Sequence, residues 1–116
     1  MNRSRLVASL VAASFLLSAS VFAQEDPKKT ERTWKAKCAS CHGQTGKGDT
    51  EKGKQLKIED MTTAAYQKKT DDEMKNAIAN GVHLEKDGAK QDMPAFKDLT
   101  PDQINALIGL VRSFKK

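Results

Sequence analysis

The chain has 116 residues, enough for one domain, and it carries a formal net charge of +5. Its lysines are scattered along the whole length and aromatic residues make up only 5% of it, so it lacks the basic stripe with interleaved aromatic side chains that nucleic-acid binding requires. This composition excludes a nucleic-acid binder. It favours a small domain whose mildly basic surface attracts acidic proteins or anionic membrane surfaces.

Residues 1–23 have the three parts of a secretory signal peptide. Two arginines come first, residues 6–17 form an apolar run, and Val21-Phe22-Ala23 provides a cleavage site. The alternative, an uncleaved membrane anchor, fits less well because a run of 12 residues is short of the roughly 20 that span a bilayer. We therefore expect cleavage after residue 23 and export to the periplasm. The mature domain, residues 24–116, has 18 Lys and Arg against 15 Asp and Glu, a net charge of +3.

Three segments of the mature domain have the apolar spacing of helices: residues 28–41, 70–80 and 100–116. The second and third begin with capping sequences, in which Thr70 and Thr100 are each followed three residues later by Glu or Gln. The second ends at an Asn-Gly pair, a helix C-terminus signal. A shorter helical turn fits residues 64–67.

The connecting stretches are predicted to be loops. Residues 43–53 contain four glycines, and residues 82–91 are polar and show no periodicity. No segment has a convincing strand pattern, and there is no internal repeat. The expected fold class is therefore all-α.

The two cysteines of the chain lie three residues apart and are followed at once by a histidine, in Cys38-Ala39-Ser40-Cys41-His42. On a helical turn both sulfurs project to one side, so both reach one edge of a planar ligand. The histidine then lies over that plane and can coordinate its metal. C-x-x-C-H is the haem attachment motif, in which Cys38 and Cys41 form thioethers and His42 supplies the proximal imidazole.

Two other interpretations of the motif fit the sequence less well. A zinc site needs four ligands, and beyond the motif the chain has only one further histidine, His83, and no second Cys-x-x-Cys. A redox-active dithiol needs a β-α-β context and a first thiol at a helix N-terminus. Here the cysteines end a predicted helix and no strands are predicted around them.

A haem iron has a sixth coordination position, for which the mature chain offers Met61, Met74, Met93 and His83. Met74 lies on the apolar face of a predicted helix and is expected in the core, and Met61 lies in a polar stretch. Met93 precedes a proline, which forces extended backbone, and apolar residues follow it. Met93 is the expected sixth ligand, and His83 is its rival.

These features in this order resemble class I cytochrome c, in particular the small bacterial monohaem type. The resemblance extends over nearly the whole mature domain, through "CASCHGQTGKGD", "TDDEMKNAIANGV", "MPAF" and "LTPDQINALIGLVRSF". It implies a helical domain at residues 24–116 wrapped around one covalently bound haem c, with N- and C-terminal helices crossing. Within the family's pattern, Cys38 and Cys41 match the thioether positions, His42 the proximal ligand and Met93 the distal ligand.

The resemblance implies two supporting features. Trp34 matches the aromatic residue of the family's N-terminal helix. The family often has a proline near residues 52–56 whose carbonyl accepts the ring N–H of the proximal histidine. That stretch here is "KGKQL", where a backbone carbonyl can still serve, and the sequence does not assign which one.

The function expected from this resemblance is that of an electron carrier and not an enzyme. With both axial positions filled, what remains is exchange of one electron with redox protein donors and acceptors through transient encounters. Membrane-bound respiratory complexes are among the expected partners, and the protein is expected to be a monomer. Two alternatives stay open: a gas-binding or peroxidase-like haem protein in which Met93 leaves the iron, and a haem-free thiol–disulfide oxidoreductase.

Overall fold

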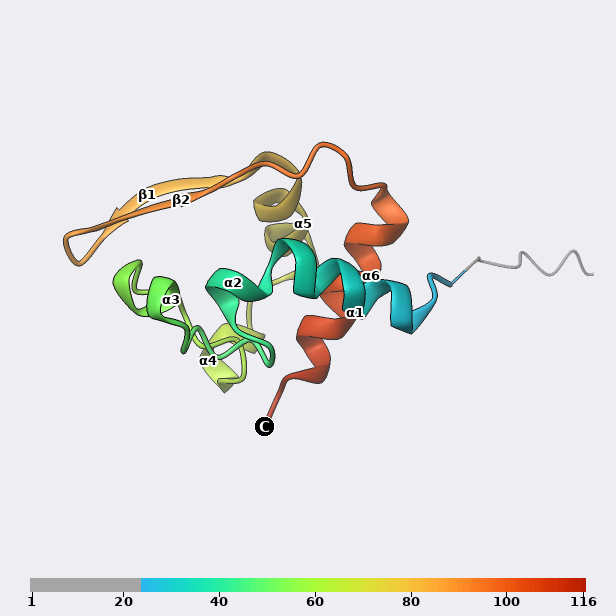
Figure 1. The fold of residues 1–116 in the computed structure, drawn as a ribbon, viewed down its shortest axis with the longest axis horizontal. Helices are drawn as coiled ribbons and strands as arrows, with labels where there is room; N and C mark the ends of the chain where they lie inside the picture. Colours follow the sequence, from blue (N-terminus) through green and yellow to red (C-terminus); the bar gives the residue numbers. More distant parts are fainter. Residues whose placement is uncertain (1–23) are drawn as a thin grey trace, which may run out of the picture.

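A computed structural model describes residues 24–116 (Figure 1), and the predicted signal peptide, residues 1–23, lies outside the described residues. The described part contains mainly helices, together with one two-stranded antiparallel sheet. No helix in residues 24–116 is both long enough and apolar enough to cross a membrane. The elements are α1 (Pro27–Lys37), α2 (Ala39–His42), α3 (Glu51–Gln55), α4 (Ala64–Gln67), α5 (Asp71–Asn80), β1 (Val82–Lys86), β2 (Ala89–Met93) and α6 (Pro101–Ser113).

The structure confirms the capped helices. In α5 the Thr70 side chain accepts a hydrogen bond from the Glu73 N–H, and the Glu73 carboxylate accepts one from the Thr70 N–H. Thr100 and Gln103 form the same reciprocal pair at the start of α6. Each pair satisfies backbone donors that have no partner within the helix. The short turn predicted at residues 64–67 is also present, as α4.

The first predicted helix, residues 28–41, is wrong in its continuity. The helix is interrupted at Cys38, whose backbone (φ −120°, ψ −42°) is not helical, so that α1 ends one residue before and α2 begins one residue after it. The predicted loop at residues 43–53 also needs correction. Thr50 caps α3 there by accepting a hydrogen bond from the Gly53 N–H, which the glycine-rich composition concealed.

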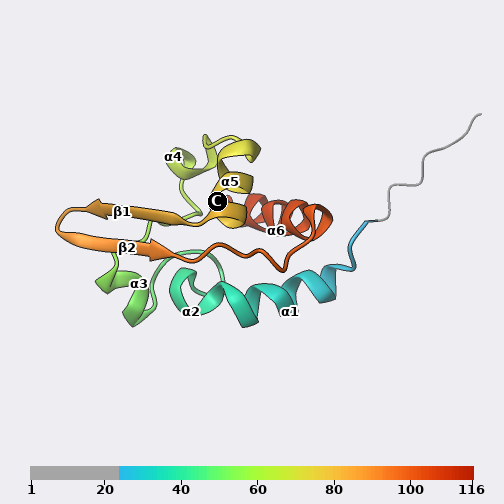
Figure 2. The ribbon, with the colours of Figure 1, turned by 90° about the horizontal axis from the view of Figure 1, so that it is seen from above.

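The all-α fold class is wrong in one respect, because residues 82–93 form a β-hairpin where a loop was predicted. Val82 pairs with Met93 and Lys86 with Ala89. The turn residues Asp87 (φ 49°) and Gly88 (φ 77°) both have positive φ, as a type I′ hairpin turn requires, and Asp-Gly is a preferred pair for that turn. Seen from above (Figure 2), the hairpin has α1–α3 on one side and α4 and α5 on the other.

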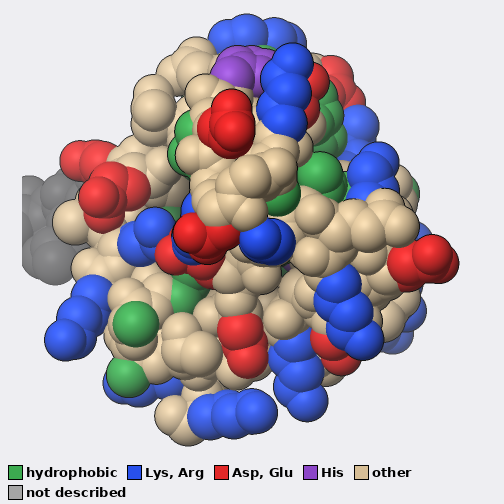
Figure 3. Space-filling model, turned by 90° about the vertical axis from the view of Figure 1, so that its left-hand side faces the viewer, with side chains coloured by type: hydrophobic (Ala, Val, Ile, Leu, Met, Phe, Trp, Pro, Cys, Tyr) green, Lys and Arg blue, Asp and Glu red, His purple; other side chains and the backbone are tan. Residues whose placement is uncertain are grey.

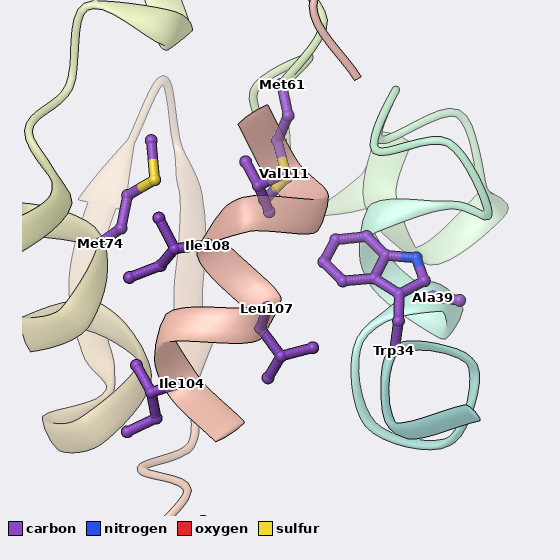
Figure 4. Close-up of a cluster of buried hydrophobic side chains, with 8 residues drawn as sticks. All are labelled: Trp34, Ala39, Met61, Met74, Ile104, Leu107, Ile108 and Val111. Atoms are coloured by element: carbon purple, nitrogen blue, oxygen red, sulfur yellow. The ribbon is translucent and has the colours of Figure 1, made fainter. Parts of the chain in front are cut away.

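The core is arranged around α6, whose apolar stripe packs on both sides (Figure 4). Trp34 and Ala39 approach α6 from one side and Met74 from the other. The Trp34 ring also meets Phe114 edge-on at a centroid distance of 5.2 Å. The buried hydrophobic side chains are Trp34, Ala39, Met61, Met74, Ile104, Leu107, Ile108 and Val111.

Arg112 connects the end of α6 with the segment between α4 and α5 through hydrogen bonds and an ion pair. Its guanidinium donates to the carbonyl oxygens of Gln67 (2.8 Å) and Lys69 (2.7 Å) and pairs with the Asp71 carboxylate at 2.7 Å. The carbonyl bonds are partly buried, whereas the carboxylate is exposed and its pairing contributes little.

We predict that Arg112→Met lowers the free energy of unfolding by about 1–3 kcal/mol, because two partly buried carbonyls lose a charged donor. Urea denaturation followed by helical circular dichroism measures this. Lys115→Met, at an exposed lysine of the same C-terminal segment, is the matched control and should change the value by less than about 0.5 kcal/mol. Equal effects of the two changes would show that Arg112 is not a structural clamp.

Candidate haem-binding site

The C-x-x-C-H motif forms one helical turn that is tied to α1. The His42 N–H donates to the Cys38 carbonyl at 2.9 Å, so the two cysteines lie one turn apart. At the end of the turn the buried Trp34 Nε1–H donates to the Gly43 carbonyl at 3.1 Å. The Trp34 ring also lies 6.0 Å, centroid to centroid, from the His42 ring. The tryptophan four residues before Cys38 therefore orients the motif.

Helix α3 packs on the other side of the motif at very short range. The Thr50 hydroxyl donates to the Cys41 carbonyl at 3.0 Å. A β-carbon at Gly53 would lie 2.4 Å from the Cys41 oxygen and 2.5 Å from the Gly48 oxygen. Only glycine fits this position. No sequence pattern indicates this role of Gly53.

Burial sets the protonation of the motif. It raises the pKa of the Cys38 thiol to about 11, against an opposing effect of Lys37 and a smaller upward effect of Cys41. A disulfide oxidoreductase needs a first thiol of lowered pKa, so this environment disfavours that alternative. Burial also lowers the pKa of His42, which keeps the imidazole neutral, the form in which it binds a metal.

The Nδ1 atom of His42 is buried and has no hydrogen-bond partner. The sequence leaves the carbonyl partner of His42 open, and in the structure no carbonyl among residues 24–116 accepts from its Nδ1–H. The ring is therefore held by packing against Trp34 and by its place on the motif turn.

The four predicted site residues line one cavity of about 570 Å³. Cys38, Cys41 and His42 come from the motif, and Met93 comes from the end of β2. The volume lies within the roughly 300–1,000 Å³ of small-molecule and cofactor sites. Two thiols and a neutral imidazole on one wall and a thioether on another fit a planar metal-bearing group. Apolar lining residues include Trp34, Leu56, Ile58, Ile78, Leu107 and Ile108.

Met93 is held against the end of α5 by close backbone contact. Gly81, with φ 78°, ends that helix, and a β-carbon on it would lie 2.5 Å from the Met93 carbonyl oxygen. Just beyond, the Phe96 N–H donates to the Ile78 carbonyl at 2.9 Å. The sequence predicts only a helix end at Gly81, because the contact with Met93 exists only in the folded chain.

The other candidates for the sixth position differ in their surroundings. Met61 and Met74 also line the cavity, but both are buried members of the core cluster. His83 is not among the cavity-lining residues. Its side chain is 66% exposed and pairs with Asp92. The structure adds no support for the zinc alternative, since residues 24–116 contain no group of three His, Cys, Asp or Glu side chains that could hold a metal ion.

Comparison with known proteins agrees with this geometry. The sequence profile of the family described as cytochrome C oxidase, cbb3-type, subunit III matches residues 25–111. Among solved structures, the protein named KustC0563 c-type cytochrome superimposes with a TM-score of 0.62 at 30% sequence identity, over 75% of this chain and 98% of that one. No curated protein matches the chain.

The fold and the motif are those of a c-type cytochrome. The chain belongs to the family of the cbb3-type cytochrome c oxidase subunit III, as a small monohaem cytochrome c. The resemblance to the small bacterial cytochromes c is thereby confirmed. Membership implies a haem protein of the electron-transfer class with haem c as its cofactor.

We predict that Gly53→Ala destabilises the protein by about 1–3 kcal/mol, because the added methyl group forces α3 away from the motif turn. Gly109→Ala is the matched control: a β-carbon there has no neighbour within 4 Å, and alanine favours the helix by up to about 1 kcal/mol. Urea denaturation of the two variants measures the difference. A stability of Gly53→Ala equal to that of the wild type would refute the close packing.

Proposed function

We propose that the protein is an exported one-electron carrier that holds a single haem c. In this proposal Cys38 and Cys41 attach the haem covalently, and His42 and Met93 are the axial ligands of its iron. The observation that supports it best is that all four side chains line one cavity. Family membership supports the cofactor.

The residues of the cavity suit electron transfer and not catalysis. When bound, haem would supply an iron that can accept one electron from a reduced donor and give it to an oxidised acceptor. The neutral His42 imidazole and the Met93 thioether would hold that iron, which would leave no position for a substrate. A thioether is a weak donor that raises the reduction potential.

Transient redox proteins are the proposed partners of a monomeric carrier. Lys37, Lys52 and Lys69 lie along the cavity, and the face that carries the hairpin turn and α3 is dotted with lysines and carboxylates (Figure 3). Encounters on such surfaces are small, weak and electrostatically steered. The family's description names a cytochrome c oxidase subunit, which supports a membrane-bound respiratory complex as a partner. The predicted signal peptide supports a periplasmic location.

The ligand assignment is tested by a methionine series in the purified holoprotein. We expect Met93→Leu to abolish the weak long-wavelength absorption band of methionine-bound ferric haem. Met61→Leu and Met74→Leu, which change the other two methionines of the cavity wall, should keep the band. Leucine conserves volume and costs less than about 1.5 kcal/mol, so all three variants should fold.

Each other outcome of the series has a defined meaning. A band lost in Met61→Leu or Met74→Leu, and not in Met93→Leu, would move the sixth ligand to that residue. A low-spin spectrum without the band in the wild type, changed by His83→Ala, would assign His83. A high-spin or readily carbon-monoxide-binding wild type would favour the gas-binding or peroxidase-like alternative.

The covalent attachment has its own test. We expect the haem to stay with the polypeptide through acid-acetone extraction, and neither sulfur to react with iodoacetamide after denaturation. Cys38→Ser and Cys41→Ser should each leave one thioether, and the double variant should release the haem. Two alkylated thiols and no haem in the exported wild type would favour the thiol–disulfide alternative.

A further inference from the structure

The hairpin has one face toward the cavity and one toward solvent. Its register pairs Val82 with Met93 and Leu84 with Gln91, and all four of these residues line the cavity. The alternate positions are charged or polar and exposed: His83, Glu85, Lys90 and Asp92. Of these four, Asp92 alone also lies at the edge of the cavity. The hairpin is therefore a wall of the cavity and not a surface appendage.

Gln91 fixes this wall to the segment after α3. Its Nε2 donates to the carbonyl oxygens of Leu56 (2.8 Å) and Lys57 (2.9 Å). An amide nitrogen carries two N–H groups, one for each carbonyl. Lys57 has left-handed helical backbone (φ 51°), which is uncommon for a residue other than glycine. Leu56 has right-handed backbone (φ −83°, ψ −1°), so the change of hand at Lys57 ends the turn where both carbonyls accept from the one amide.

The remaining polar contacts of the hairpin with this segment are exposed, whereas the bond from Gln91 to the Leu56 carbonyl is partly buried and the one to Lys57 is exposed. The Lys57 Nζ donates to the Asp87 carbonyl, and Lys86 lies 3.6 Å from Glu59, with both side chains more than 40% exposed. Exposed pairs of this kind contribute little to stability. Gln91 is half-buried and makes two hydrogen bonds to neutral acceptors, so it is the main polar attachment between the two segments.

We propose that Gln91 is the positioning residue of the sixth iron ligand. Met93 lies two residues further along β2 on the same face, so the attachment that fixes Gln91 also fixes the side of the strand on which the thioether lies. When the attachment opens, the hairpin lifts and Met93 withdraws. This inference rests on the proposed ligation of iron by Met93.

The test is imidazole binding to the ferric holoprotein. Imidazole occupies the sixth position only when Met93 leaves it, so its apparent affinity rises with the population of the open hairpin. Gln91→Glu is nearly isosteric but directs a carboxylate at two carbonyl oxygens. We expect imidazole to bind at least about tenfold tighter, which corresponds to about 1.4 kcal/mol, the net value of one hydrogen bond.

Two further variants make the result specific. Gln91→Leu removes the amide without adding a charge or a second thioether to the cavity and should give the same direction of change, so the proposal stays testable if Gln91→Glu folds poorly. Gln44→Glu is the matched control, since Gln44 is exposed and does not line the cavity. Its imidazole affinity should equal that of the wild type.

Amide hydrogen exchange separates positioning from general destabilisation. In the Gln91 variants we expect faster exchange within residues 82–93 and unchanged exchange in α6, whereas a general structural role would accelerate both. Imidazole affinities within twofold of the wild type in both Gln91 variants would overturn the proposal. A wild type without the methionine–haem band would instead refute the ligation by Met93, and the inference with it, before any variant is examined.

Discussion

The rest of the structure depends on one constraint, the cavity. Its lining residues come from every helix and both strands of the described domain. Apolar side chains on opposite walls of such a cavity make few contacts with one another across it. The walls therefore need attachments on the side that faces away from the cavity. The side chains of Trp34, Arg112 and Gln91 each donate to backbone carbonyls outside the elements that carry them. These outer attachments stabilise a domain that is too small for a large core of its own, and a haem in the cavity, as proposed, would add to them.

The parts of the fold that the sequence predicts are those determined by local chemistry. Thr70 and Thr100 meet their capping partners three residues away, and the apolar spacing of α6 matches the stripe that packs in the core. The motif residues Cys38, Cys41 and His42 also belong to one turn. Their arrangement depends on helix geometry and not on distant parts of the chain.

The features that the sequence did not predict depend on contacts between distant segments. The Asp-Gly pair of the hairpin turn was a usable local signal, but the polar Gln91 on the inner face masked the alternation of β2. Gln91 is satisfied by carbonyls 34 and 35 residues earlier in the chain. Gly53 and Gly81 are required because other backbone segments approach them closely. No propensity at those positions reports such an approach.

The two proposed axial ligands are consequently held by different kinds of interaction. His42 is adjacent to Cys41, and the Trp34 side chain that supports its turn is bonded to a carbonyl only nine residues away. Met93 depends on the fold of residues 82–93 and on a glutamine bonded across the cavity wall. In the proposed site, attachment of the haem would therefore be a local property of the chain, whereas occupation of the sixth position would be a tertiary one. Changes in the hairpin would then alter the sixth ligand, and with it the reduction potential, while leaving the attachment turn intact.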